Sequence, residues 1–185
     1  MSRLQCCNMR FFKNLIPFDS LTAPQLQVEI YTKWQESLIS IEYRLIGNTK
    51  QLYLPHKQRP RRVIGLWEST CFEFFIKHPN GEDYVEFNFS PEGFWNCFYF
   101  PHKKAPLKAF EAYSTPDMKL INRNDGLSFY VTLTLEQLPI HLEQTAQIST
   151  PCVLDNRGKL SYWAFSHLDP FANFHNFESF LPISF

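Results

Sequence analysis

The stretch that decides the fold is residues 66–100, LWESTCFEFFIKHPNGEDYVEFNFSPEGFWNCFYF. Apolar and polar residues alternate in three successive segments of this stretch, which is the pattern of half-buried strands. Two turn-forming sequences separate the segments, His78-Pro79-Asn80-Gly81 and Ser90-Pro91-Glu92-Gly93. The stretch therefore predicts three consecutive antiparallel strands joined by two tight turns.

The register of these strands predicts which side chains share a face. If each turn closes as a four-residue loop, Glu73 lies opposite Glu86, and Asn88 lies opposite Trp95. A shift of two residues at the first turn keeps Glu73 on the face of Glu86 and Asn88, because side-chain direction has a period of two. One sheet face is therefore expected to gather Glu73, Glu86, Asn88, Trp95, Cys97 and Tyr99.

Short alternating segments continue on both sides of this stretch. They predict strands at 25–30, 38–46, 52–54, 112–121, 127–135, 145–154, 159–166 and 180–185, whereas 1–24 lacks periodicity and is expected to be an irregular lead-in. There is no long amphipathic helix, internal repeat or dividing linker. The predicted fold is one all-β domain over residues 1–185, a two-sheet antiparallel β-sandwich of jelly-roll type with about ten to eleven strands and little helix.

Composition restricts the function classes. The 18 basic and 18 acidic residues give a net charge of zero, which argues against broad nucleic-acid binding because that binding relies on neutralising phosphates. The basic run at 57–62 is expected to be a solvated loop. Aromatic residues make up 17% of the chain, which suits strands and provides surfaces on which a ligand can stack.

Cysteine usage and the N-terminal sequence indicate the compartment. The five cysteines are odd in number and form no C-x-x-C pair, so neither a disulfide framework nor a zinc site is indicated. The first residues lack the apolar core of a signal peptide, and no apolar run is long enough to span a membrane. A cytoplasmic protein with reduced cysteines and no membrane partner is expected.

Glu73 and Glu86 are the first candidates for chemistry. Facing carboxylates repel each other unless a cation, a ligand that donates hydrogen bonds, or a raised pKa offsets the repulsion. A retaining glycosidase needs two carboxyl groups about 5–5.5 Å apart, so hydrolysis is one interpretation. Ligand binding is a second, and hydrogen bonding to backbone or arginine groups at the rim of the fold is a third.

Trp67, Trp95 and Trp163 are the candidate stacking platforms. A sugar presents an apolar ring face to an aromatic side chain and hydroxyl groups to carboxylates and amides, and Trp95 beside Asn88 and Glu86 fits that description. The alternative is that each tryptophan belongs to the core.

His167 and His175 flank an Asp169-Pro170 turn. They can be interpreted as metal ligands together with Glu86 or Asp169, or as hydrogen-bonding anchors of the C-terminal segment. No nucleophile motif of the G-x-S-x-G type and no glycine-rich phosphate loop is present.

Several segments taken together resemble bacterial DOMON-like proteins, which are related to family 9 carbohydrate-binding modules. The segments are LWESTCFEFFI, YVEFNFSPEGFWNCFYF and SYWAFSH with a following FH. The resemblance covers roughly residues 25–185, with its motifs in 66–100 and 160–177. It implies a jelly-roll sandwich with ligand sites for sugars or, in some DOMON relatives, haem.

The residues of this chain that match the DOMON-like motifs lie in two groups. Those of the central motif are Trp67, Glu73, Glu86, Asn88, Ser90, Pro91, Trp95 and Tyr99. Those of the C-terminal motif are Tyr162, Trp163, His167 and His175. Members of the group often carry a Tyr-Arg pair after the third strand, where this chain has His102-Lys103-Lys104, so the implied site lacks one bidentate guanidinium.

The leading hypothesis is a non-catalytic module that binds a carbohydrate or a similar polyhydroxylated small molecule. Trp95 and Trp163 would stack on the ligand, and carboxylate and amide groups would take its hydroxyl hydrogen bonds. The expected ligand-binding residues are Trp67, Glu73, Glu86, Asn88, Trp95, Tyr99, Trp163, His167 and His175.

Three alternatives remain open at this point. The first is a haem- or metal-binding domain in which Met118 acts with His102, His167 or His175. The second is a glycoside hydrolase that uses Glu73 and Glu86. The third is a protein-interaction surface made of exposed aromatic residues, with no small ligand.

Overall fold

The computed structural model describes residues 9–142 and 145–184. Within them the chain forms strands and only short 3-10 helices, which confirms the all-β class. The strands are β1 (Met9–Pro17), β2 (Leu26–Gln35), β3 (Leu38–Gly47), β4 (Arg61–Arg62), β5 (Cys71–Lys77), β6 (Tyr84–Phe89), β7 (Phe94–Phe100), β8 (Asp117–Arg123), β9 (Gly126–Thr134), β10 (Thr145–Ser149), β11 (Cys152–Asp155), β12 (Leu160–Ala164) and β13 (Leu181–Ser184). The 3-10 helices are Thr49–Gln51, Leu66–Glu68, Leu135–Gln137 and Phe177–Ser179.

The strands form one continuous hydrogen-bonded sheet. Eleven of them follow the order β4-β7-β6-β5-β11-β12-β1-β2-β3-β9-β8, and β10 pairs with β5 and β13 beside this path. The described strand pairs are antiparallel except for β4 and β7, which run parallel. The sheet is therefore mixed, whereas the sequence predicts a purely antiparallel arrangement.

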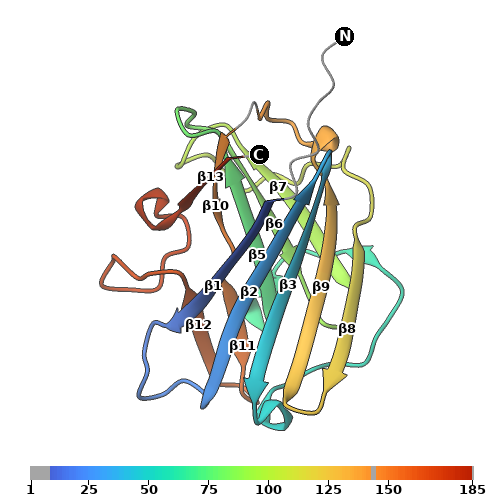
Figure 1. Ribbon diagram of the computed structural model, residues 1–185, viewed down its shortest axis with the longest axis vertical. Helices are drawn as coiled ribbons and strands as arrows, with labels where there is room; N and C mark the ends of the chain where they lie inside the picture. Colours follow the sequence, from blue (N-terminus) through green and yellow to red (C-terminus); the bar gives the residue numbers. More distant parts are fainter. Residues whose placement is uncertain (1–8, 143–144, 185) are drawn as a thin grey trace.

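The sheet curls so that its two halves face each other across one core. In Figure 1 the half made of β1, β2, β3, β9 and β8 lies in front, and β5, β6 and β7 pass behind it. Phe72 of β5 stacks on Phe129 of β9 with ring centroids 4.6 Å apart, and lies 5.0 Å from the ring of Tyr43 in β3. All three side chains are fully buried, so the apolar sets of the alternating strands form the interior.

Strand β1 joins the two halves, and it corrects the expected irregular lead-in. Its first part pairs with β2, whereas Ile16 and Pro17 pair with β12. Leu15 is buried in the core, but Phe12 on the opposite face is exposed. Because apolar residues occupy both faces, period-two alternation is absent and the strand is not visible in the sequence. Residues 1–8, including Cys6 and Cys7, lie outside the described residues.

Two other sequence expectations change in the structure. The predicted return strand at 52–54 is wrong, because the 3-10 helix Thr49–Gln51 follows β3 and places Leu52 in the core. The predicted strand 145–154 divides into β10 and β11, with Pro151 between them. Proline has no backbone N–H for a ladder, which explains the break.

The basic run also differs from the expected solvated loop. Arg61 and Arg62 form the short parallel strand β4, and their guanidinium groups lie 4.3 Å and 4.1 Å from the ring centroids of Phe94 and Trp95. The Arg62 guanidinium also donates to the carbonyl oxygen of Tyr113 at 2.7 Å. This end of the basic run therefore fixes the edge of the sheet.

The cysteines that the structure describes, Cys71, Cys97 and Cys152, are free and buried. In the described part of the chain, no helix has the length and apolar character needed to cross a membrane.

Candidate functional site

The acidic residues of the central meander lie on the outer face of the β5-β6-β7 half, away from the core. Glu73 pairs with Asn88, and Glu86 pairs with Phe75. The first turn therefore differs from a four-residue loop, since Lys77 pairs with Tyr84 and residues 78–83 connect them. Because the resulting shift is even, Glu73, Glu86 and Asn88 share one face as predicted.

The second turn corrects the prediction for β7. Phe89 pairs with Trp95, which leaves residues 90–94, five residues, between them. Ser90 closes this turn: its backbone N–H donates to the carbonyl oxygen of Phe94 at 2.8 Å, and its Oγ accepts from the Phe94 N–H at 3.1 Å. The odd residue count inverts every side chain of β7 relative to the four-residue expectation.

The inverted register places the predicted β7 ligands in the interior. Trp95 is 2% exposed, and Cys97 and Tyr99 face the same main core. Trp163 is also buried there, and its indole N–H donates to Ser161 Oγ at 3.0 Å. The expected grouping of Trp95, Trp163 and Tyr99 with the acidic residues is therefore wrong.

The observed register places Asn96 and Phe98 of β7 on the outer face, in place of Trp95, Cys97 and Tyr99. The amide of Asn96 is used at the sheet edge, where its Oδ1 accepts from Arg62 Nη1 at 2.9 Å and its Nδ2 donates to the Val63 carbonyl oxygen at 3.2 Å. Phe98 packs beside Trp67, with ring centroids 6.3 Å apart in an edge-to-face arrangement. Trp67 is partly buried and is the one predicted tryptophan on this face.

The two histidines have different surroundings. The Nδ1 of His175 lies 2.8 Å from the Tyr84 hydroxyl, and its Nε2 lies 3.8 Å from Glu86 Oε2. His167 instead places its Nε2 3.0 Å from the carbonyl oxygen of Ile16 and its ring beside Phe18. The structure therefore brings His175 to the acidic residues, whereas His167 anchors the C-terminal segment to β1.

We call Glu73, Glu86, Asn88 and His175 the acidic site. Glu73 and Glu86 are each 4% exposed, and Asn88 is fully buried. Asn88 Nδ2 donates to Glu86 Oε1 at 2.9 Å. Neither carboxylate has a lysine or arginine partner among residues 9–142 and 145–184, so the predicted arginine hydrogen bonds are not found in this part of the chain.

Two buried oxygen atoms of the acidic site lack a hydrogen-bond partner within the described residues. They are Glu86 Oε2 and Asn88 Oδ1. Most buried polar atoms in folded proteins are hydrogen-bonded, and leaving one unpaired costs roughly 1–3 kcal/mol. These two residues, which are joined by a hydrogen bond, therefore keep unused acceptor capacity in the acidic site.

Burial controls the charge of the acidic site. It raises the pKa of Glu86 to about 7, although the hydrogen bond from Asn88 opposes the shift. Burial and the neighbouring Glu86 raise the pKa of Glu73 well above its usual range. The two groups therefore hold at least one proton near neutral pH, and the protonated carboxyl can donate a hydrogen bond.

Burial and the nearby Lys103 lower the pKa of His175, so its imidazole is neutral at the same pH. Lys103 belongs to the segment that replaces the Tyr-Arg pair of the DOMON-like group, and its Nζ lies 5.5 Å from the ring centroid of Phe177. A cation therefore still lies near the site, although it lacks the paired donors of a guanidinium.

Aromatic side chains surround the acidic site. Tyr84 stacks on Phe100 with centroids 4.6 Å apart, and Phe180 packs on the same cluster. Tyr84 lies two residues before Glu86 in β6, so strand alternation places it on the same face as Glu86 and Asn88. The contributions of Phe174 and Phe177 carried no sequence signal, because they come from the distant C-terminal segment.

The structure separates two of the candidate haem ligands, Met118 and His175. Within the described residues, no group of three or more His, Cys, Asp or Glu side chains is placed to hold a metal ion. Met118 of β8 packs against the main core, whereas His175 lies on the outer face of the other half. Met118 and His175 therefore do not fit a shared haem.

The fold is similar to that of known carbohydrate-binding proteins. A protein from Bacteroides uniformis, provisionally named a carbohydrate-binding protein, superposes with a TM-score of 0.67 at 12% identity over 94% of this chain and 85% of that one. A family 9 carbohydrate-binding module from Caldicellulosiruptor kristjanssonii, solved in complex with cellotriose, gives a TM-score of 0.60 at 11% identity over 94% of this chain and 81% of the module. The chain has a fold like that of a family 9 carbohydrate-binding module. No protein-family profile matches the sequence, and no curated protein is significantly similar to it.

Proposed function

We propose that this protein is a non-catalytic binding module, a jelly-roll sandwich of the DOMON-like kind, whose acidic site binds a carbohydrate or a similar polyhydroxylated molecule. The observation that carries the proposal is the pair of buried acceptors, Glu86 Oε2 and Asn88 Oδ1, that have no partner in the described part of the chain. The fold-level likeness to carbohydrate-binding proteins supports the ligand class.

Sugar hydroxyl groups suit this arrangement because each one can donate and accept. Glu86 Oε2 and Asn88 Oδ1 offer acceptors, and a protonated Glu73 offers a donor. The 3.8 Å between His175 Nε2 and Glu86 Oε2 is too long for a direct hydrogen bond, but a hydroxyl placed near both can contact each of them.

Trp67 takes the stacking role in this proposal. It is partly buried beside Phe98 at the margin of the aromatic cluster, and an indole face matches the apolar face of a pyranose. Trp95, Trp163, Tyr99 and His167 have no part in the proposed site, because their contacts lie elsewhere.

The charge state favours binding over hydrolysis. A glycosidase separates the pKa values of its two carboxyl groups, so that one is an ionised nucleophile or base and the other an acid. Here burial raises the pKa of both Glu73 and Glu86, and no arginine or lysine of the described residues forms an ion pair with either carboxylate.

Calorimetric titration with glucose, xylose, cellobiose and cellotriose tests the proposal. We expect binding of at least one sugar, and a roughly tenfold or greater loss of affinity in Trp67→Ala and in Glu86→Gln. Tyr53→Ala and Glu82→Gln are matched controls, because both residues are exposed and lie outside the acidic site. Failure of every sugar to bind at millimolar concentration contradicts the proposal, as does equal loss in the controls.

A further inference from the structure

A hollow lies on the opposite side of the core from the acidic site, on the outer face of β1, β2, β3 and β9. Its volume is about 480 Å³, within the range of small-molecule sites. Arg10 and Phe12 of β1 line one side, and Tyr31 and Lys33 of β2 continue the surface. The acidic site belongs to the other half of the sheet, so the two places are independent.

Strand register arranges the lining in two rows. Arg10 lies opposite Lys33, and Lys33 lies opposite Ser40. In the next row Phe12 lies opposite Tyr31, and Tyr31 lies opposite Glu42. Like charges directly opposite each other destabilise a sheet, so the first row carries an unfavourable pair of cations.

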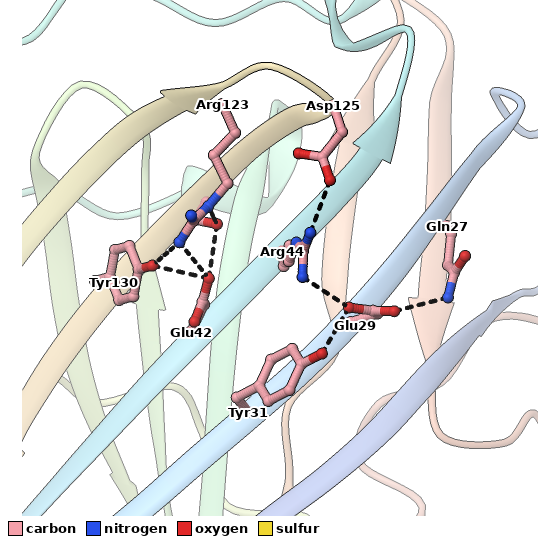
Figure 2. A network of polar contacts seen from close by, with 9 residues as sticks. Gln27, Glu29, Tyr31, Glu42, Arg44, Arg123, Asp125 and Tyr130 are labelled. Carbon is pink, nitrogen blue, oxygen red and sulfur yellow. Dashed lines mark hydrogen bonds and ion pairs between the residues drawn. The ribbon is translucent and has the colours of Figure 1, made fainter.

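The acidic residues close to these cations are already paired. Figure 2 shows Glu42 between Arg123 and Tyr130, which donate to its Oε1 at 3.0 Å and 2.9 Å. The same figure shows Arg44 joined to Asp125 at 2.7 Å and to Glu29 at 3.8 Å. Each carboxylate of this network therefore contacts an arginine, and Asp125 and Glu29 share Arg44.

Arg10 and Lys33 have no acidic partner within residues 9–142 and 145–184. Lys33 Nζ donates to the neutral amide oxygen of Gln35 at 3.1 Å, and the ion pairs of the described residues include neither cation. This end of the hollow therefore carries uncompensated positive charge.

An exposed aromatic pair lies next to the cations. Phe12 is 50% exposed and Tyr31 is 36% exposed, with ring centroids 4.8 Å apart. The Tyr31 hydroxyl donates to Glu29 Oε2 at 2.8 Å, which holds the ring in place against the sheet. Large aromatic side chains fixed in this way form a platform for a flat ligand.

We propose that this hollow is a second binding site, for a small organic anion whose ring presents an apolar face. The carboxylate or phosphate would lie on Arg10 and Lys33, the ring on Phe12 and Tyr31, and a hydroxyl group near Ser40. An acidic sugar and an aromatic acid both have this chemistry. The ligand charge separates the two sites, because the acidic site offers no such pair of cations.

Nuclear magnetic resonance titration of the full chain with glucuronate, benzoate, inorganic phosphate and glucose tests the site. Glucuronate and benzoate are the two sources of the chemistry, phosphate tests the anion alone, and glucose tests the ring without charge. We expect one of the two ring-bearing anions to bind more tightly than phosphate and glucose, with shifts confined to β1, β2, β3 and β9.

Charge variants measure the role of the cations. Arg10→Gln and Lys33→Gln are each expected to weaken anion binding by roughly tenfold, because each removes a charge-assisted hydrogen bond. Lys13→Gln is the matched control, since Lys13 is an exposed cation of the same strand that does not line the hollow. Equal loss in Lys13→Gln contradicts the proposal.

Aromatic variants separate the ring from the charge. Phe12→Ala is expected to weaken glucuronate or benzoate binding but not phosphate binding. Phe18 is an exposed aromatic residue outside the hollow, so Phe18→Ala is expected to leave the binding of all three anions unchanged. Glu86→Gln is expected to leave anion binding intact, so failure of the acidic site and failure of this site are distinguishable.

Three results overturn the second site. One is the absence of binding by either ring-bearing anion at millimolar concentration. Another is equally tight binding of glucose. The third is sedimentation showing a dimer that Phe12→Ala dissociates, which would assign the hollow to a second copy of the chain.

Discussion

The two outer faces of the sheet treat their carboxylates in opposite ways. On the β5-β6-β7 face, Glu73 and Glu86 are buried beneath aromatic side chains and have no basic partner among the described residues except the neutral His175. On the β1-β2-β3-β9 face, Glu42 and the largely buried Glu29 each contact an arginine. Both faces derive from the same strand alternation, so the presence of arginine counterions, rather than sequence pattern, distinguishes the ion-pair network from the acidic site.

The largest loss of stability is expected from a change in the core that both halves of the sheet share. Phe72→Ala removes the ring that joins β5 to β9 and leaves a cavity, which is expected to lower the free energy of unfolding by about 3–5 kcal/mol. Urea denaturation measures the change. Phe12→Ala, on the exposed face, is the control and is expected to cost far less. Similar losses in the two variants would contradict a shared core centred on Phe72.

The next effect concerns the proton held in the acidic site. Glu86 has a pKa raised from 4.5 to about 7, so the folded state binds more protons than the unfolded chain between these pH values. Its contribution to stability is complete below about pH 4.5 and is lost as the pH rises through about 7. We expect the Glu86 contribution to fall by about 3 kcal/mol over this window.

Urea denaturation at several pH values measures this contribution as the difference between the protein and its Glu86→Gln variant. Glu29→Gln is the control, because Glu29 lies on the other face beside Arg44 and Tyr31. Parallel stability curves for the protein and Glu86→Gln would show that folding does not change the pKa of Glu86, and the contrast between the two faces would then fail.

A smaller effect tests the turn that determines which residues reach the acidic face. Ser90→Ala removes the Oγ that accepts from the buried Phe94 N–H, which is expected to cost about 1–2 kcal/mol in unfolding free energy. Chemical denaturation provides the measurement, with the exposed Ser20→Ala as control. A Ser90→Ala protein as stable as the control would indicate that the serine does not hold the five-residue turn.

The smallest effect is expected in the solvated network. Arg123→Gln breaks an ion pair with Glu42 that is partly exposed on both sides, and exposed pairs contribute about 0.2–1 kcal/mol. The loss should shrink further in 1 M salt because surface charges are screened. Denaturation at low and high salt checks this. A loss above 2 kcal/mol that is insensitive to salt would mean that this face is as tightly coupled to the fold as the acidic site.

Much of the fold could be read from alternation because side-chain direction along a strand is a local property. The strands at 38–46 and 127–135 correspond to β3 and β9, and Glu73, Glu86 and Asn88 share a face. Strand β1 could not be read in this way, since it lies where the sheet curls and presents apolar residues on both sides.

The sequence by itself determined the all-β class and the common face of Glu73, Glu86 and Asn88, because an even shift at the first turn leaves their direction unchanged. Only the tertiary structure decided the orientation of β7, because one extra residue in the turn closed by Ser90 sends Trp95 into the core. It also decided the partner of Tyr84, which is His175, 91 residues away. The alternation of side-chain direction along a strand depends only on neighbouring residues, whereas turn conformation and long-range contacts depend on how the whole chain packs.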